Sequence, residues 1–329
     1  YWGLRDYGVE PQEWGVQPDC DHIWVGHHRR GMSGGTGEKS PLQRVDSRKA
    51  VMFEGREFFH CRVCGGWRVP LGLEHSQELF VEHLIMVFSE IHRVLRDTGT
   101  VWVNLGDTYH DKELVGVPWL FAFAMKRAGW ILRRDNIWSK PNPMPEPCSD
   151  RTTTAHEYIF HFTKIKQGYY YDADSIREPH TTKVIDGWEP ARGVYGEKVK
   201  GTRGPAGWHE GGRNKRSVWD VPVQPYAEAH FATFPPKLIR PCILAGCPKG
   251  GVVLDPFLGS GTTAFVAREE GRRAIGIELS EEYCRLIGVR TSQYSLLTQP
   301  ATECVRPLRQ ERPEETDAPL SVDQQLLLP

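Results

Sequence analysis

The residues best suited to chemistry are an acid and two glycines that lie close together late in the chain. Asp255 ends a short run of β-branched and apolar residues that begins at Val252, and the turn Gly259-Ser260-Gly261 follows it. Thr262 then opens a helical pattern that closes at Gly271. Glycine lets the backbone approach a ligand without a Cβ in the way, and the first turn of a helix has unpaired N–H groups that face the loop. The stretch therefore predicts a strand, a ligand-binding loop and a helix.

A second acid, Glu278, ends the next apolar run, which begins at Arg273. It lies about 20 residues after the glycine turn, where nucleotide-binding α/β units carry an acid for ribose hydroxyls. The turn lacks the third glycine of the dinucleotide fingerprint, and no lysine follows it as in a phosphate-binding P-loop. The pattern therefore favours a cofactor that has a ribose but no phosphates.

Four further residues have the chemistry of a metal site. Cys61 and Cys64 form a Cys-x-x-Cys pair followed by glycine, and Cys20 and His22 lie upstream in a segment with little periodicity. These side chains could complete a tetrahedral structural zinc site. The alternatives are free thiols in a loop, or a ligand from His27-His28 in place of His22. A zinc ion would hold together an insertion that has few apolar residues of its own.

Alternating helix and strand patterns predict the framework that positions these residues. An apolar face predicts a helix that starts at Ser76, and residues 100–105 have the pattern of a buried strand. Further patterns predict a helix over 117–128, a strand over 130–138, a proline-rich rim loop over 140–145, a strand over 157–162 and a helix after Ser280. Ligand-binding residues of open α/β sheets lie at the carboxyl ends of strands, so Asn104, Asp107 and Tyr109 are candidate pocket residues. A simple turn role is the alternative for Asp107.

The composition is that of one large α/β domain with insertions. The chain has 329 residues, of which 39% are hydrophobic and 25% charged, and it can bury a full core. No apolar run approaches the length of about 20 residues that a bilayer requires, and the first residues lack the pattern of a secretory signal. Eight scattered cysteines in a chain of this length indicate reduced thiols. We therefore expect an intracellular, cytoplasmic protein with no membrane partner.

Residues 183–216 form the candidate nucleic-acid surface. The formal net charge of the chain is −1, so contacts with nucleic acid require a local basic patch. This stretch has eight Lys or Arg residues against four acids, interleaved with Trp188, Tyr195 and Trp208. Basic residues and aromatics in glycine-rich loops suit phosphate contacts and base stacking. The alternative is a solvated, flexible insertion.

The string from Asp255 to Thr263, together with Gly276-Ile277-Glu278, resembles the S-adenosylmethionine motif of the DNA amino-methyltransferases. These enzymes methylate the exocyclic amine of cytosine or adenine. Residues 1–8, Tyr-Trp-Gly-Leu-Arg-Asp-Tyr-Gly, resemble the continuation of the catalytic Ser/Asp-Pro-Pro-Tyr loop of the family. The two prolines and their strand are therefore expected upstream of Tyr1. The order, with the catalytic segment before the cofactor segment, is similar to one permuted class of these enzymes.

The resemblance implies roles for individual residues. It implies S-adenosylmethionine as the cofactor, bound by the motif and by a segment that packs on its methionine end: Asp255, Pro256, Phe257, Gly259, Ser260, Gly261, Thr262, Glu278, Phe231, Thr233 and Phe234. It implies Tyr1 and Trp2 as catalytic residues, with Tyr1 stacked on a flipped base. Lys140 and Asn142, in a Trp-x-Lys-x-Asn-Pro loop, and His156, in a His-Glu strand start, would flank a target-base pocket together with Asp107 and Tyr109.

The implied fold is an α/β, Rossmann-like S-adenosylmethionine-dependent methyltransferase sheet with helices on both faces, a zinc-knuckle-like insertion and a loop-rich target-recognition region. The expected division is a catalytic-loop remnant over 1–8, an insertion over 9–75, a catalytic half over 76–182, target-recognition loops over 183–229, a cofactor-binding half over 230–297 and a disordered tail over 298–329. The implied partner is double-stranded DNA, and the expected protein is a monomer or homodimer of prokaryotic or phage type.

Cytosine-N4 is the favoured target, because the Tyr-Trp-Gly-Leu-Arg-Asp-Tyr continuation is associated with the Ser form of the catalytic loop. Adenine-N6 is the alternative. From another class of protein, the alternative is a non-catalytic, zinc-containing DNA-binding protein with a cofactor-only domain.

Overall fold

The computed structural model describes residues 9–28, 57–180, 209–224 and 233–292. The predicted catalytic residues Tyr1 and Trp2 and the predicted cofactor residue Phe231 lie outside these ranges. So do the predicted tail over 298–329 and most of the predicted recognition loops.

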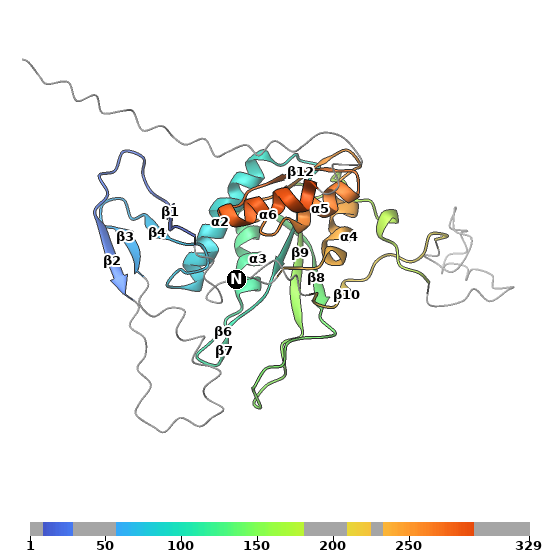
Figure 1. Ribbon diagram of the computed structural model, residues 1–329, viewed down its shortest axis with the longest axis horizontal. Coiled ribbons are helices and arrows are strands. Elements are labelled where there is room, and N and C mark those ends of the chain that lie inside the picture. Colours follow the sequence, from blue (N-terminus) through green and yellow to red (C-terminus); the bar gives the residue numbers. More distant parts are fainter. Residues whose placement is uncertain (1–8, 29–56, 181–208, 225–232, 293–329) are drawn as a thin grey trace, which may run out of the picture.

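A mixed four-stranded sheet forms the centre of the fold (Figure 1). Its strands, in spatial order, are β10 (Val218–Asp220), β8 (Ile131–Ser139), β9 (His156–Thr163) and β5 (Thr100–Leu105). β9 pairs antiparallel with β8 and β5, and β10 pairs parallel with β8. Three of these strands are confirmed predictions. The strand β10 was expected to be loop, because it is short and lies in a stretch without periodicity.

Helices cover both faces of this sheet, as predicted. α2 (Gln77–Val94) and α3 (Val117–Arg127) pack on the face of β9 that carries Phe160. α4 (Pro236–Gly246) packs on the opposite face, which carries Ile159. Because successive side chains of a strand point to opposite faces, β9 contributes to both apolar cores.

The helix predicted from Ser76 begins at Gln77, with Ser76 as its N-cap. The Ser76 hydroxyl accepts a hydrogen bond from Leu79 N at 3.2 Å and so satisfies one of the free N–H groups of the first turn of α2. Among the helices of the described ranges, none has both the length and the apolar character needed to cross a membrane.

The predicted cofactor-binding half contains a parallel pair of strands and two helices: β11 (Val252–Asp255), α5 (Thr262–Glu269), β12 (Arg273–Gly276) and α6 (Glu281–Ser292). The strand that was expected to reach Glu278 ends at Gly276. A Cβ at Gly276 would lie 2.1 Å from Leu258 Cδ2, so the glycine lets the loop after β11 pack directly on the strand end. Glu278 therefore follows β12 in a short connection to α6.

Helix α4 joins the two sheets. Thr100 of β5 donates a hydrogen bond from Oγ1 to Gly246 O at 3.3 Å. At the other side of the helix, Arg240 pairs with Glu269 at 2.7 Å and with Glu270. Within the described residues, no strand pairing joins β5 to β11, and Ile243 of α4 also packs with Val266 and Ala267 in a buried apolar cluster.

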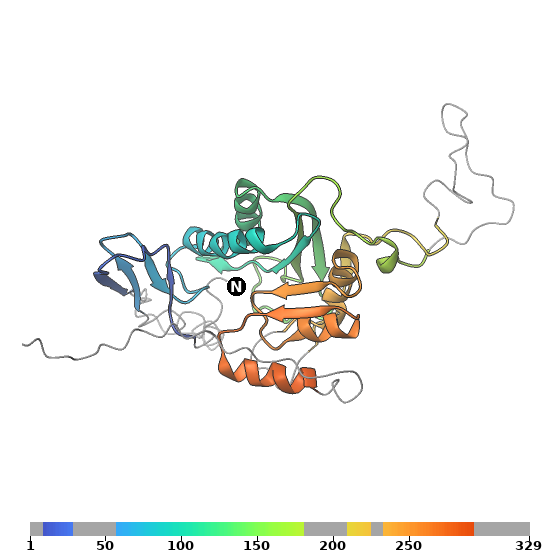
Figure 2. The ribbon, with the colours of Figure 1, turned by 90° about the horizontal axis from the view of Figure 1, so that it is seen from above.

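The insertion predicted over 9–75 contains a second four-stranded sheet, which corrects the expectation of an irregular segment. The strands of this antiparallel N-terminal sheet, in spatial order, are β1 (Gln12–Trp14), β4 (Trp67–Val69), β3 (Glu57–Cys61) and β2 (Trp24–His28). The sequence did not reveal them because each has only three to five residues. The sheet lies beside α2 and away from the β11–β12 pair in both views (Figures 1 and 2).

The N-terminal sheet contacts α2 through a buried polar pair. The Trp14 ring stacks on the His83 ring at 4.5 Å, and Trp14 Nε1 donates to Val69 O at 2.9 Å. His83 Nδ1 in turn lies 2.9 Å from Glu74 Oε1, and both side chains are buried. These contacts pack β1 and β4 of the N-terminal sheet against α2.

Candidate active site

Two glycines shape the loop between β11 and α5. Gly259 has a φ of 53° and Gly261 a φ of 82°, in the left-handed region that side chains disfavour. A Cβ at Gly259 would have only Phe257 O within 4 Å, at 3.9 Å, whereas one at Gly261 would lie 3.0 Å from Ile287 Cγ1. Gly259 therefore leaves space for a ligand, and Gly261 lets α6 pack close to the loop.

Asp255 organises the backbone of this loop. Its carboxylate accepts a hydrogen bond from Phe257 N at 2.9 Å and another from Thr263 Oγ1 at 2.5 Å. Burial raises the pKa of Asp255, and the nearby Glu278 carboxylate adds to the rise against the opposing effect of the two hydrogen bonds. Pro256 is half-buried and the Phe257 side chain is exposed beside the loop. Both oxygens of Asp255 are thus engaged, one by the loop and one by the first turn of α5.

Glu278 lies against the same loop. Its Oε2 accepts a hydrogen bond from Gly259 N at 2.8 Å, and its Oε1 accepts one from Ser280 N at 2.8 Å. Leu258 N also donates to Ile277 O at 3.0 Å, so the two connections run side by side. The structure therefore brings together the glycine turn and the acid that the sequence singled out. The open space at Gly259 and the adjacent carboxylate fit a cofactor with ribose hydroxyls.

Two predicted cofactor residues, Ser260 and Thr262, are buried behind the loop. Arg290 of α6 donates from Nη1 to Thr262 Oγ1 at 3.1 Å and to Ser260 Oγ at 3.3 Å. Sequence reasoning missed Arg290, since a single arginine in an amphipathic helix carries no distinguishing signal. Thr233 is half-buried, and Phe234 packs against the apolar core under α4.

A polar cluster lies where β5 and β8 end and β9 begins. Glu157, 9% exposed, pairs through Oε1 with Lys140 Nζ and accepts at Oε2 from Asn104 Nδ2 at 3.0 Å. Asn104 Nδ2 also donates to Tyr158 O at 3.1 Å, and Lys140 Nζ lies 4.5 Å from the centre of the Trp138 ring. Glu157 joins the two predicted residues, although sequence reasoning treated it only as part of a strand start. The feature of the sequence that could have identified Glu157 is an acid at the beginning of an apolar strand.

Asn142 and His156 flank this cluster without joining it. Asn142 Nδ2 donates to Val223 O at 3.1 Å, and Asn142 Oδ1 accepts from Val223 N at 2.8 Å. His156 is exposed, and its ring meets the Tyr158 ring edge-on at 5.4 Å. Asn142 therefore fastens the loop after β8 to the segment after β10.

Asp107 has the turn role that the sequence analysis left open. Its Oδ1 accepts hydrogen bonds from Thr108 N at 2.9 Å, Gly116 N at 3.0 Å and Val117 N at 3.1 Å. The carboxylate therefore closes the base of a hairpin and the start of α3, where a negative charge is favourable. This hairpin consists of β6 (Tyr109–His110) and β7 (Glu113–Leu114).

Tyr109 contacts the connection between β8 and β9, residues 140–155, which we call the β8–β9 loop. The Arg151 guanidinium lies 3.9 Å from the centre of the Tyr109 ring, and Arg151 Nη2 pairs with Glu146 Oε2 at 3.0 Å. The hairpin and the loop project from the same end of the central sheet (Figure 1). Tyr109 thus supports the loop rather than the Lys140–Glu157 cluster.

The described part of the predicted recognition region is a stem closed by one carboxylate. Glu178, just after the short helix η3 (Asp174–Ile176), lies 3.1 Å from Arg216 Nε, 3.4 Å from Arg213 Nη2 and 3.5 Å from Lys215 Nζ. Backbone hydrogen bonds of 2.9 Å also join Glu178 and Arg213 in both directions. Three of the eight basic residues counted over 183–216 therefore contact a protein carboxylate. The other five lie outside the described residues.

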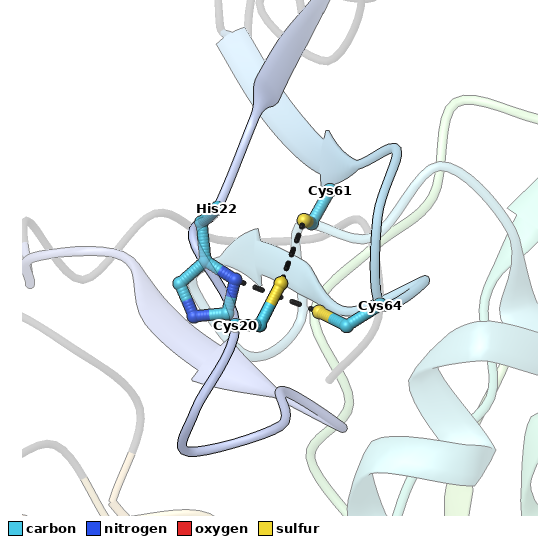
Figure 3. A group of neighbouring side chains, drawn as sticks. All are labelled: Cys20, His22, Cys61 and Cys64. Atoms are coloured by element: carbon cyan, nitrogen blue, oxygen red, sulfur yellow. Dashed lines mark hydrogen bonds between the residues drawn. The ribbon is translucent and has the colours of Figure 1, made fainter.

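Cys20, His22, Cys61 and Cys64 converge at one end of the N-terminal sheet (Figure 3). Their ligand atoms all lie within 4.8 Å of one another. Cys20 Sγ is 3.9 Å from Cys61 Sγ, and Cys64 Sγ is 3.5 Å from His22 Nδ1. A tetrahedral zinc ion with ordinary bond lengths needs roughly 3.8 Å between two sulfurs and roughly 3.6 Å between sulfur and nitrogen. The four side chains therefore have the spacing of a tetrahedral zinc site.

The environment of this group lowers the pKa of two cysteines, Cys61 and Cys64, whereas burial raises the pKa of Cys20 to about 12. Burial opposes ionisation of Cys61, but hydrogen bonds from the Cys64 and Val63 backbone and from His22 outweigh it and lower the pKa of Cys61 to about 6. Thiolate is the form of cysteine that binds metal.

Comparisons with known proteins agree with this arrangement. A family model described as DNA methylase matches residues 70–288. The chain is 42% identical over 242 residues to the type II methyltransferase M.Cfr9I of Citrobacter freundii, covering 65% of this chain and 71% of that protein. It is 37% identical over 279 residues to the type II methyltransferase M.SmaI of Serratia marcescens, covering 73% of this chain and 87% of that protein.

Among solved structures, the PvuII DNA methyltransferase, titled cytosine-N4-specific, has a similar fold. The TM-score is 0.51 at 19% sequence identity, and the match covers 65% of this chain and 71% of that chain. The shared architecture is an α/β sheet with helices on both faces.

Proposed function

Because the chain belongs to the DNA methylase family, we propose that it transfers a methyl group from S-adenosylmethionine to the exocyclic amine of a base in double-stranded DNA. The observation that carries the proposal is the contact between Glu278 and Gly259, at the ends of β12 and β11. It lies within the segment that the family model matches.

In this proposal the loop after β11 binds the cofactor. Gly259 offers free space and a backbone that a ligand can approach, and Glu278 offers a carboxylate to ribose hydroxyls. Asp255 and Arg290 keep the loop in shape from inside the protein, and the exposed Phe257 ring is available to contact an adenine. When bound, S-adenosylmethionine supplies an electrophilic methyl group on its sulfonium sulfur.

The cluster of Lys140, Glu157 and Asn104 is the proposed boundary of the target-base site. An exocyclic amine is a weak nucleophile because its lone pair is delocalised into the ring, so the base must leave the duplex and meet the cofactor in line. The cluster supplies an ammonium group, an amide and a carboxylate at the carboxyl ends of β5 and β8, where open α/β sheets bind their ligands. These groups match the acceptors and donors on the edge of a flipped base.

Cytosine is the proposed target base. The support is the similarity of residues 1–8 to the Ser form of the catalytic loop, which is associated with the amine of cytosine. Cytosine and adenine both present an amine beside a ring-nitrogen acceptor, so adenine is the competing target for the same site.

We also propose a structural zinc ion bound by Cys20, His22, Cys61 and Cys64. The distances of 3.9 Å and 3.5 Å within the group support a closed tetrahedral site with four protein ligands, the arrangement of structural rather than catalytic zinc. The ion would join the connection between β1 and β2 to the turn between β3 and β4 and so hold the N-terminal sheet together.

We propose a separate role for each of three segments of the chain. Residues 76–182 provide the catalytic half, residues 230–297 the cofactor half, and residues 183–229 contact the DNA target. The stem held by Glu178 supports this last assignment, because it fixes both ends of the stretch that the sequence identifies as basic and aromatic.

The test is a transfer assay with the full-length protein, cofactor labelled in its methyl group and double-stranded plasmid DNA. The proposal requires label in the DNA. Cofactor that binds without any transfer would instead favour a DNA-binding protein with a cofactor-only domain.

A further inference from the structure

Met144 is the most exposed of the large hydrophobic side chains in the described residues, at 86% of its surface. It lies in the β8–β9 loop, four positions after Lys140, and has Pro143 and Pro145 as neighbours. Burying such a side chain in an apolar environment is favourable, so a partner that covers Met144 would gain free energy from the contact. The sequence analysis placed this loop at the rim of the site but assigned no role to the methionine.

The β8–β9 loop holds Met144 on a braced backbone. Lys140 N donates to Ala155 O at 2.8 Å and closes the base of the loop. Asn142, two residues before Met144, makes its two hydrogen bonds to Val223. On the other side, Glu146 accepts from Thr154 N at 3.2 Å and pairs with Arg151.

The prolines add to this stiffness. Pro141, Pro143, Pro145 and Pro147 occupy every second position of the segment, and each fixes its own φ and restricts the residue before it. Met144 therefore loses little backbone freedom when it binds a partner, although its side chain remains flexible. A flexible apolar side chain on a rigid loop is suited to enter a narrow apolar space.

The position of the β8–β9 loop indicates which apolar space the Met144 side chain enters. The loop leaves the sheet at Lys140, beside Glu157 and Asn104, where the proposed target-base site lies. A base that enters this site leaves a gap in the stack of the duplex, and proteins commonly insert apolar side chains such as methionine between base steps.

We infer that Met144 enters the base stack and occupies the space that the target base vacates. This inference rests on the proposed function. Met144 is in this role a positioning residue: it does not touch the reacting amine but keeps the base from returning to the duplex. The alternative is that the exposed Met144 side chain contacts the surface of another protein.

The experiment compares Met144→Ala, Met144→Leu and the wild-type full-length protein on two versions of a short duplex that the wild type methylates. One version is fully paired, and the other has an abasic site opposite the target base, which makes extrusion of that base easier. Val94→Ala, at an exposed position at the end of α2, is the matched control for loss of a surface apolar side chain.

For Met144→Ala we expect kcat/KM on the paired duplex to fall at least tenfold and on the abasic duplex to fall less than threefold. Met144→Leu and Val94→Ala should stay within threefold of the wild type on both. Cofactor affinity should be unchanged in all four proteins, which also verifies folding. In the paired duplex, a fluorescent purine analogue next to the target should report less unstacking with Met144→Ala.

An alanine variant that methylates both duplexes like the wild type, or loses activity equally on both, would overturn the role of Met144 alone. A concentration-dependent dimer that Met144→Ala abolishes, with methylation intact, would assign the side chain to a protein contact instead. A wild-type protein that methylates no duplex would overturn the proposed function, and this inference with it.

Discussion

The Glu278 carboxylate accepts a hydrogen bond of 2.8 Å from Gly259 N, so the acid that follows β12 closes the glycine turn that follows β11. The two residues are 19 positions apart in the sequence and lie in the connections that follow the neighbouring parallel strands β11 and β12. This contact gives the glycine turn and the acid a shared structural role, because the carboxylate shapes the loop, and in the proposed cofactor site the same carboxylate would also bind the ribose.

Replacing Glu278 tests the assignment of the cofactor site. Glu278→Ala removes the acceptor for ribose hydroxyls and for Gly259 N, so cofactor affinity should fall tenfold or more, about 1.4 kcal/mol of binding free energy. Titration calorimetry with S-adenosylmethionine measures the effect. Glu282→Gln, at an exposed position in the first turn of α6, is the control and should bind like the wild type. Equal affinity for the Glu278 variant would remove this residue from the site.

Removal of one ligand tests the zinc proposal. The wild-type protein should contain one zinc ion per chain by elemental analysis, and Cys61→Ser should contain almost none, because a structural site needs all four ligands. Cys148→Ser, at a cysteine outside the group, should keep its zinc. A chelator should lower the melting temperature of the wild type and not that of Cys61→Ser. Wild-type protein purified without zinc and unaffected by chelator would exclude the site.

The pair of Lys140 and Glu157 provides a prediction that separates stability from catalysis. Glu157→Ala leaves Lys140 without its partner at a mostly buried position, which should cost on the order of 3 kcal/mol of unfolding free energy. Methylation of DNA should fall at least tenfold in kcat/KM while cofactor affinity changes less than threefold. The double variant Lys140→Met, Glu157→Gln should regain most of the unfolding free energy that Glu157→Ala loses, but its methylation of DNA should stay low. Full activity in the double variant would show that the cluster is structural only.

His161 should make the protein sensitive to acid. Its ring stacks on Trp102 at 4.1 Å, and burial together with the nearby Arg133 lowers its pKa from 6.5 to about 4. Between pH 6.5 and about pH 4, His161 binds a proton in the unfolded chain but not in the folded protein. The contribution of His161 to the unfolding free energy is therefore complete above pH 6.5 and is lost as the pH falls toward 4. The total is roughly 3 kcal/mol.

The matched variant is His161→Phe, which keeps an aromatic ring on Trp102 and has no titrating group. Between pH 7 and pH 5 its unfolding free energy should decrease by about 2 kcal/mol less than that of the wild type in denaturant titrations. His156→Phe, at an exposed histidine, should follow the wild-type curve. The same loss of stability in the wild type and in His161→Phe would contradict the prediction.

The central elements could be predicted from the sequence because each has a strong local signal. The helix from Ser76 has a cap and a long apolar face, and the strands over 100–105 and 157–162 are continuous apolar runs. The glycine turn and Glu278 could be paired by their spacing alone, since a strand, a loop and a helix of ordinary length return the chain to the neighbouring strand.

Features that depend on distant contacts could not be predicted. The short strands β1 and β10 acquire their structure from partners β4 and β8, not from a pattern of their own. Asp107 looked like a pocket residue because it follows a strand, but three backbone N–H groups up to ten positions later bind its carboxylate. Arg290 and Glu178 are likewise defined by contacts that join separate segments.

The central claim, methyl transfer to an exocyclic amine of DNA, is tested most directly by identifying the methylated nucleoside. Double-stranded DNA of mixed sequence is incubated with the full-length protein and cofactor labelled in its methyl group, then digested to nucleosides, which are separated by chromatography against standards of each methylated nucleoside. We expect label in N4-methylcytosine, and at least tenfold less of it when Glu278→Ala is assayed at low cofactor concentration. Label in N6-methyladenine alone would contradict the choice of base, and label in a ring carbon or in no nucleoside would contradict the central claim itself.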